Sequence, residues 1–257
     1  MCQVRKYNKN KLFFCAGFMK KSLLFLISTL LFMTYLLCSA NSNSTITTST
    51  QTQKILPNDI IHITNALNTY KNGIEVLHAY YSYPQFPDSF KQSVSLNQFY
   101  TKQLYNDYKK IQELRNAALE NEIPPNLSYA YDHTFEVTFL TNHFLSILEN
   151  DYQYAGGAQP DTSSRAHTFS LQTGRELTLE SLFLKPRADT ENKIKDFIIE
   201  EIKKHPDDYY PDAAFTISNM SLESFQFFLD KKGITIFFNP FEISPYARGM
   251  VKFPLKL

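Results

Sequence analysis

The chain has 257 residues, of which 43% are hydrophobic, 26 are basic and 25 are acidic. This composition is sufficient for one substantial core or two small ones. Phenylalanine (22) and tyrosine (16) are abundant, whereas glycine (7) is scarce and tryptophan is absent. The aromatic content favours β-structure and excludes a disordered or collagen-like chain.

The N-terminal segment has the layout of a secretory signal. Lys20 and Lys21 precede an almost wholly apolar run, 23–37, and the small residues Ser39 and Ala40 follow it. A basic region, an apolar region and a cleavage site in this order direct export. We therefore expect residues 1–40 to be a leader and the protein to be periplasmic, secreted or exposed at the cell surface.

Several points about this leader stay open. Translation starts at Met1 or at Met19, which directly precedes the two lysines. The leader is cleaved after Ala40, lipidated at Cys38 or retained as a membrane anchor. The three residues before Cys38 are Tyr, Leu and Leu, whereas a lipobox has a small residue there. The polar residues 41–54 read as a flexible linker, which suits a tether after a lipidated cysteine.

Removing the leader changes the charge and the cysteine content. Six of the 26 basic residues lie in positions 1–40, which contain no acid, so residues 41–257 carry 20 basic and 25 acidic groups, a net charge of about −5. A nucleic-acid binder would need the opposite sign. All three cysteines, Cys2, Cys15 and Cys38, lie in the leader. The exported part therefore has no disulfide, thiol nucleophile or thiolate metal site.

The first elements predicted in the body are a β-hairpin and a long helix. Residues 60–83 are rich in β-formers, and Asn72-Gly73 within them is a hairpin turn signal. Residues 93–120 then carry apolar side chains at spacings of three and four, which predicts a helix with one buried stripe. The expected stripe consists of Leu96, Tyr100, Leu104, Tyr108, Ile111 and Leu114.

Three further strands are predicted, at residues 128–140, 142–154 and 166–171. Phe135, Val137 and Phe139 alternate with polar residues, which is typical of a strand with one buried face. The turn between the second and third strands contains Gly156-Gly157, and this pair indicates a tight backbone geometry.

The remaining pattern predicts a second helix at residues 190–204, a hairpin of residues 222–229 and 234–238, and a last strand at 251–257. Pro254 places that strand at an edge or a bulge. This order indicates an α+β fold with largely antiparallel sheets, one long helix in the N-terminal half and a shorter helix in the C-terminal half. We expect two domains, 55–158 and 159–257.

The segment 239–249, Asn-Pro-Phe-Glu-Ile-Ser-Pro-Tyr-Ala-Arg-Gly, connects the last two strands. Two prolines exclude a regular helix or a central strand, yet the segment is aromatic, so it reads as a rigid, partly buried loop. Glu242 lies between the prolines, where its carboxylate can accept hydrogen bonds from loop amides, and Arg248 is its expected ion-pair partner.

Three motifs together resemble one bacterial family. They are Tyr-Ala-Gly-Gly-Ala-Gln-Pro at 154–160, the stretch 170–183 and the loop 239–249. They resemble the paired uncharacterised domains that form the extracellular region of lysozyme-sensing anti-sigma factors of the RsiV type. The same pair stands beside the NodB-type catalytic domain of the peptidoglycan deacetylase PdaC. The resemblance implies an exported cell-envelope module whose relatives bind lysozyme or accompany wall-modifying enzymes.

The chain departs from this family in two respects. The family usually has His after Gly-Gly-Ala, whereas this chain has Gln159. Residues 41–257 also leave no room for a NodB-type domain, and no cytoplasmic sigma-binding segment is visible before the apolar run. Neither the deacetylase activity nor the anti-sigma activity is therefore carried over, and we expect a protein that is not an enzyme.

The sequence contains no recognisable catalytic motif, and no catalytic residue, metal site or cofactor is assigned. His-Glu-x-x-His, Gly-x-Ser-x-Gly and phosphate-binding loops are all absent. Asp132-His133 is the most enzyme-like pair, but adjacent residues of a strand point to opposite faces, so His133 reads as a surface histidine. A metal cluster of His133, His143 and His167 would require all three on one face.

The expected function is that of an exported envelope module that binds a ligand, either lysozyme or a peptidoglycan-related molecule. The acidic and aromatic segment 207–212 suits a basic protein partner. The alternatives are a wall-active hydrolase or deacetylase with an unrecognised site, and a lipid-tethered structural protein. Membrane contact is expected only through the leader or a lipid at Cys38. The candidate binding residues are Gly156, Gly157, Gln159, Asp207, Asp208, Tyr209, Tyr210, Asp212, Glu242, Tyr246 and Arg248.

Overall fold

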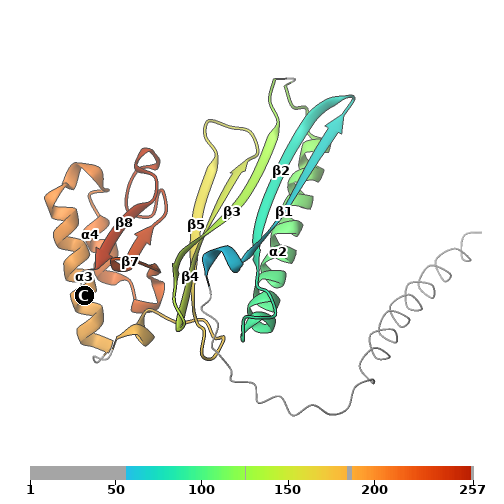
Figure 1. The fold of residues 1–257 in the computed structure, drawn as a ribbon. Coiled ribbons are helices and arrows are strands. Elements are labelled where there is room, and N and C mark those ends of the chain that lie inside the picture. The colour runs from blue at the N-terminus through green and yellow to red at the C-terminus, as the bar shows by residue number, and fades with distance from the viewer. Residues whose placement is uncertain (1–55, 125, 184–186, 256–257) are drawn as a thin grey trace, which may run out of the picture. The chain divides into compact units, whose positions relative to one another are not determined.

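Two β-sheets and three α-helices make up the computed structural model, which describes residues 56–124, 126–183 and 187–255 (Figure 1). Every described residue belongs to one compact unit, Thr52–Leu257. The predictions for the leader, for Met19 and Cys38 and for the linker up to residue 54 lie outside the described residues. The mixed architecture confirms the α+β prediction.

The first sheet has five strands in the order β1-β2-β3-β4-β5. All neighbours are antiparallel except β2 and β3, which run parallel because the long helix α2 connects them as a crossover. The strands of this sheet and the crossover helix are, in chain order, β1 (Ile61–Lys71), β2 (Ile74–Gln85), α2 (Ser93–Glu120), β3 (Tyr129–Leu140), β4 (Phe144–Tyr154) and β5 (Asp161–Ser170). The hairpin at Asn72-Gly73 and the bounds of the long helix are as predicted.

Helix α2 packs one apolar stripe on the first sheet. Leu96, Tyr100, Ile111 and Leu114 are buried in two clusters with side chains of β2 and β3. Tyr108, which the sequence places in the stripe, is 48% exposed instead. The neighbouring Asp107 is only 1% exposed and takes the inward position, where it joins a buried ionic cluster described below.

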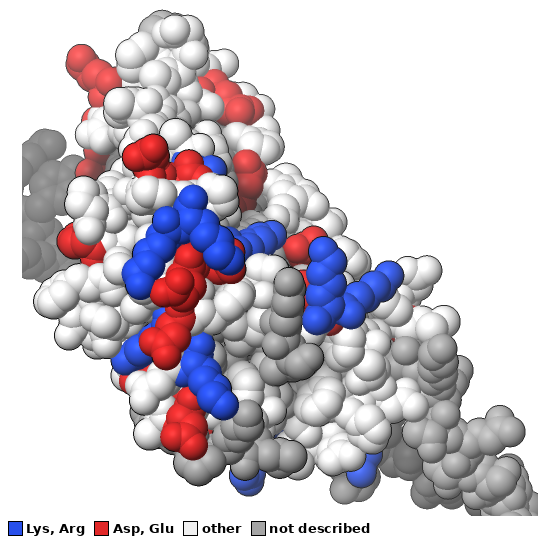
Figure 2. Space-filling view, turned by 90° about the vertical axis from the view of Figure 1, so that its left-hand side faces the viewer, with Lys and Arg blue, Asp and Glu red and all other residues white. Residues whose placement is uncertain are grey.

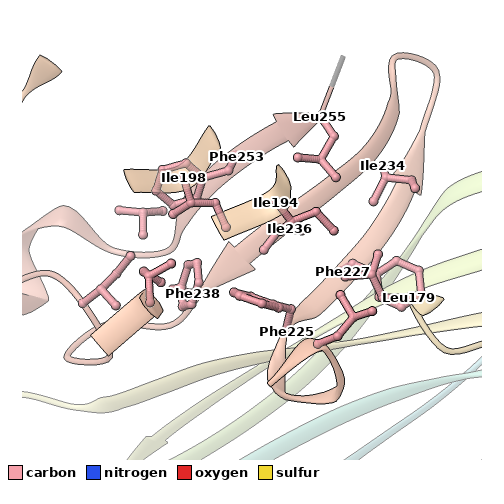
Figure 3. Close-up of a cluster of buried hydrophobic side chains, with 14 of the residues drawn as sticks. Leu179, Ile194, Ile198, Phe225, Phe227, Ile234, Ile236, Phe238, Phe253 and Leu255 are labelled. Carbon is pink, nitrogen blue, oxygen red and sulfur yellow. The ribbon is translucent and has the colours of Figure 1, made fainter. Parts of the chain in front are cut away.

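The second sheet has the order β6-β7-β8 and is covered by helices α3 and α4. Its core contains Ile194 and Ile198 of α3 beside Ile236, Phe238 and further side chains of the sheet (Figure 3). The elements are the 3-10 turn η2 (Glu180–Leu182), α3 (Arg187–Lys204), the 3-10 turn η3 (Pro206–Asp208), α4 (Ala213–Asn219), the 3-10 turn η4 (Leu222–Ser224), β6 (Gln226–Asp230), β7 (Gly233–Phe238) and β8 (Val251–Leu255).

Two details of this half concern the predictions. Pro254 lies in β8 at the edge of the sheet, as the sequence predicts. Helix α4 is not predicted, because it spans only seven residues. The predicted boundary between residues 158 and 159 stays a prediction, and β5, which follows it, pairs with β4 in the first sheet.

The two sheets pack face to face between the helices, as Figure 1 shows. Leu148 of β4 is buried with Phe228 of β6 and Phe237 of β7, and Ala166 and Met250 pack against this cluster. The contact also has a buried polar part, because the Leu229 backbone N–H donates to Ser146 Oγ at 2.9 Å. One part of the outer face of β4 and β5 therefore packs against the second sheet, and the other part does not.

Candidate functional site

The open part of this face forms the floor of a cleft. Two cross-strand rows follow from the register of β3, β4 and β5. One row is Asp132, Tyr152 and Thr162, and the next is Thr134, Asn150 and Ser164. Residues two apart on a strand share a face, so both rows point to the same side of the sheet. These floor residues carry hydroxyl, amide, carboxylate and phenol groups, while most of the exposed surface of the cleft lining is apolar.

The loop between β7 and β8 forms the opposite wall. Pro240, Gly249 and Met250 line the cleft, whose volume is about 330 Å³, together with Asp151 and Ser163 of the first sheet. We call this space the composite cleft, since it lies between the first sheet and the 239–249 loop. Two residues of the 239–249 loop, Pro240 and Gly249, line the cleft, but no lining residue is among the predicted binding residues.

Asn239 and Glu242 hold the loop in place. The side chain of Asn239 accepts a hydrogen bond from the Ser164 backbone N–H at 2.6 Å and donates to the Ser164 carbonyl at 3.0 Å. Glu242 Oε2 accepts from the Asn239 backbone N–H at 2.7 Å. The predicted role of Glu242, holding the turn through a loop amide, is confirmed. Tyr246 packs against Phe241, with ring centroids 5.5 Å apart, and Phe241 is 55% exposed.

The segment 207–212 lies beside the same loop. Arg248 pairs with Asp208 at 3.0 Å, and the Tyr210 N–H donates to the Ile243 carbonyl at 3.0 Å. The predicted pairing of Arg248 with Glu242 is wrong, since Glu242 folds back on its own loop. Tyr209 stacks on Phe253, and burial raises the pKa of its phenol against the opposing effect of Arg248. Two of the three predicted binding segments are therefore brought together.

The third predicted segment is the turn between β4 and β5. Gly156 and Gly157 have φ values of +86° and +108°, a region that glycine occupies without strain, as the pair predicts. Tyr154 donates from its hydroxyl to the Gly157 carbonyl at 3.1 Å, and Gln159 is exposed. The turn extends the strands that carry Tyr152 and Thr162, so it continues one end of the cleft floor.

The opposite face of the first sheet carries a buried ionic cluster that the sequence analysis does not predict. Arg165 of β5 contacts three carboxylates: Glu149 at 2.7 Å, Asp107 at 2.9 Å and Asp151 at 3.1 Å. Tyr83 donates from its hydroxyl to Asp107, and Lys110 pairs with Asp107 at 2.9 Å. Helix α2 and strands β2, β4 and β5 thus contribute to one network.

His133 belongs to this cluster and is fully buried, so its prediction as a surface histidine is wrong. Its Nδ1 lies 2.6 Å from Asp151 Oδ1, its Nε2 lies 3.9 Å from Glu149 Oε2, and its ring stacks on Tyr83. Asp132 does not orient it, as expected from the strand geometry. The partner comes from the cross-strand position, since His133 is paired with Asp151 in the register.

The electrostatics of the cluster follow from burial and close charges. Burial alone would raise the pKa of Asp107, but hydrogen bonds from Tyr83 and Lys110 and the charge of Arg165 hold it below its usual value. Burial alone would lower the pKa of Arg165, yet Asp151, Glu149 and Asp107 raise it. Burial and the nearby Asp107 raise the pKa of Tyr83. The ionised forms of Asp107 and Arg165 therefore stabilise the native state.

The three histidines proposed for a metal cluster do not converge. His167 Nδ1 lies 2.6 Å from Glu176, and His143 Nδ1 lies 3.0 Å from Gln172 Nε2. His133 is enclosed in the ionic cluster. Among the described residues, no group of three or more His, Cys, Asp or Glu side chains is arranged to hold a metal ion. No helix of the described ranges is long and apolar enough to span a membrane.

Comparison with known families defines the class of protein. Residues 70–162 match the family model described as Deacetylase PdaC, and residues 181–257 match the model described as Protein of unknown function (DUF3298). The chain carries a PdaC domain and a DUF3298 domain in tandem, which confirms the resemblance to the paired domains.

Solved structures show the same fold. A member of the DUF3298 family from Bacteroides fragilis is 19% identical, with a TM-score of 0.56, and the match covers 77% of this chain and 90% of that one. A DUF3298 family protein from Pseudomonas aeruginosa is 13% identical, with a TM-score of 0.53 and coverages of 77% and 92%. No curated protein matches the chain.

Proposed function

We propose that this protein is an exported module of the bacterial cell envelope that binds a peptidoglycan-related ligand in the composite cleft without transforming it. The secretory layout of residues 1–40 supports export. The match of one half to a domain named for the deacetylase PdaC supports an envelope location. The cleft supplies the ligand site, because it lies where the two matched halves meet.

The chemistry of the floor carries the proposal. Hydroxyl and amide groups of Thr134, Asn150 and Ser164 line it, beside the half-exposed ring of Tyr152. Small-ligand sites combine apolar and aromatic surface with a few placed polar groups. A sugar ring has hydroxyls at its rim and an apolar face, so it fits a surface that offers hydrogen bonds beside an aromatic ring. Wall fragments are therefore the favoured ligand.

The arrangement of acids and imidazoles favours binding over catalysis. General acid–base catalysis requires groups within hydrogen-bond reach of a reacting atom. His133 is enclosed below the sheet, and Glu242 is bonded to its own loop. Asp151 lines the cleft but is held by His133 and Arg165. The groups that a hydrolase or deacetylase would use thus lie apart from one another.

Co-sedimentation with purified peptidoglycan, followed by calorimetric titration with soluble wall fragments, tests the proposal. We expect binding by the wild type and about tenfold weaker binding by Y152A, a loss of ~1.4 kcal/mol. Y105A is the matched control, because Tyr105 is 59% exposed on α2, away from the cleft. Absence of binding, or equal losses in both variants, would contradict the proposal. Turnover of the fragments would contradict its non-catalytic part.

A lysozyme-like basic protein is the second candidate ligand. Asp207, Asp212 and Glu242 are exposed near the exposed Phe241, so acidic and aromatic groups gather on these loops. The charge there is limited, however. Asp208 is paired with Arg248, and Figure 2 shows basic and acidic side chains interspersed over the face that carries α3. Binding of lysozyme that D207N and D212N weaken, and Y152A does not, would favour this candidate.

A further inference from the structure

Strand β1 forms an open edge of the first sheet. It is 11 residues long, and among the described strands only β2 pairs with it. Helix α2 packs against β2 and β3 rather than over β1. No other strand in the described part of the chain takes up the backbone N–H and C=O groups on the outer side of β1, and most of its side chains are exposed.

This edge lacks the features that normally prevent strand addition. Residues 61–70 include no Lys, Arg, Asp, Glu or Pro, and the bulge at Thr69/Tyr70 leaves the first eight residues regular. Soluble proteins usually protect an edge by a short strand, a charge or a proline. Strand β8, one edge of the second sheet, shows all three, with five residues that include Lys252 and Pro254. The contrast within one molecule marks β1 as an interaction surface.

Apolar groups flank the edge on the side of α2. Ile61 is 50% exposed and Ile63 is 36% exposed. Ile63, Pro84 and Leu104 line a groove of about 270 Å³ between the strands and α2. A strand added to β1 would bury its own apolar side chains here, which removes exposed hydrophobic surface from both partners.

We infer that the occupant of this edge is the β1 strand of a second copy, paired antiparallel about a two-fold axis at Asn65. The sequence is self-complementary in this register. Ile63 then faces Leu67 on the side of α2, while Thr64 faces Ala66 on the other. No pair opposes like charges, and a two-fold pairing closes, since each copy uses the same β1 edge once. The result is a continuous sheet of ten strands.

Sedimentation velocity of the exported protein tests the pairing through Asn65, which is exposed and faces its own counterpart. We expect a dimeric wild type. N65K and N65E should each weaken the dimer at least tenfold, because like charges oppose each other, and an equimolar mixture of the two should restore a heterodimer. N116K is the matched control, because Asn116 is exposed on α2; it should leave the dimer intact.

A second measurement uses the absence of cysteine from residues 41–257. Directly opposed residues of antiparallel strands have Cα atoms about 4.5–5.5 Å apart, a distance that a disulfide spans. The N65C variant should therefore form a covalent dimer on mild oxidation, and N116C should not. A monomeric wild type, including one that captures an extended peptide of another protein at this edge, overturns the inference. So does a dimer that N65K leaves unchanged.

Discussion

Asn239 recognises the backbone of Ser164, 75 residues earlier in the chain, through both ends of its side-chain amide. The carbonyl oxygen accepts from the Ser164 N–H and the amino group donates to the Ser164 carbonyl. Strand β5 is at the edge of the first sheet and has no neighbouring strand on this side among the described residues, so the Asn239 side chain takes the place of a strand backbone. The contact joins β5 to the 239–249 loop beside the composite cleft, so Asn239 helps to hold the wall of the cleft in place.

Replacing Asn239 should therefore loosen this connection. N239A leaves a partly buried N–H and C=O without their partners, which costs about 1–3 kcal/mol. We expect the free energy of unfolding in urea to fall by this amount, and the amides of the 239–249 loop to exchange faster with deuterium. N142A, at an exposed position of the β3–β4 turn, is the control. Unchanged stability and exchange in N239A would show that the amide contact is dispensable.

The comparison of sequence and structure shows which features periodicity can reveal. Helix α2 was predictable because apolar side chains recur at spacings of three and four from Leu96 to Leu114. Asp107 interrupts this spacing at an inward position, between Leu104 and Ile111, and a charge there signals a buried ion pair. The predicted stripe places Tyr108 inward in place of Asp107, and the buried ion pair is therefore not predicted. Glu149, two residues after Ile147 on the inward face of β4, carries the same information.

The rest of the ionic cluster and the cleft could not be predicted from local patterns. Asp107, Glu149 and Arg165 come from three elements, and their contacts depend on the register of β4 and β5 and on the docking of α2. The cleft likewise joins residues around Asp132 and Ser164 to the loop near Gly249. A single sequence specifies which residues share a strand face but leaves open which faces meet.

Arg165 should be among the residues most sensitive to substitution. R165M leaves three carboxylates, two of them almost fully buried, without the cation that they share. Removing one partner of a buried ion pair costs about 3–5 kcal/mol. Urea unfolding should show a loss in this range, with a smaller loss for R165K, whose single ammonium cannot contact all three acids.

The control for this prediction is R175M, at an exposed arginine in the turn after β5. Surface substitutions usually change stability by about 0.5 kcal/mol or less. If R165M and R175M lose similar amounts, the cluster contributes nothing beyond a surface charge, and the prediction is wrong.

Asp107 should make the protein sensitive to acid. Its pKa is lower in the folded state than in the unfolded chain, so folding favours the ionised form. The stabilisation is present above the unfolded-state pKa of about 3.9 and is lost as the pH falls through the lower folded-state value. The free energy of unfolding should therefore decrease as the pH falls below about 4.

The variant D107N should be less stable than the wild type at neutral pH and should show a shallower loss in acid, because position 107 no longer titrates. Denaturation midpoints measured across this range give the comparison. D88N, at an exposed position, is expected to follow the wild-type profile. A D107N profile parallel to that of the wild type would assign the acid sensitivity to other groups.

Gly174 lies in the turn after β5 and packs against the start of α2. It has φ +72°, and a Cβ atom there would lie 2.5 Å from Ser95 Oγ and 2.9 Å from Gln92 Oε1. Gly73, in the β1–β2 hairpin, has a similar φ of +80° but no atom within 4 Å of the corresponding position.

Both G174A and G73A carry the backbone cost of a left-handed non-glycine residue, about 1–2 kcal/mol. G174A should lose additional stability, because the Ser95 hydroxyl and the Gln92 side chain must move away, which disturbs the hydrogen bond from Gln92 to the Gln172 carbonyl. Thermal unfolding of the two variants measures the difference directly, and equal melting temperatures would mean that the turn makes no close contact with the helix.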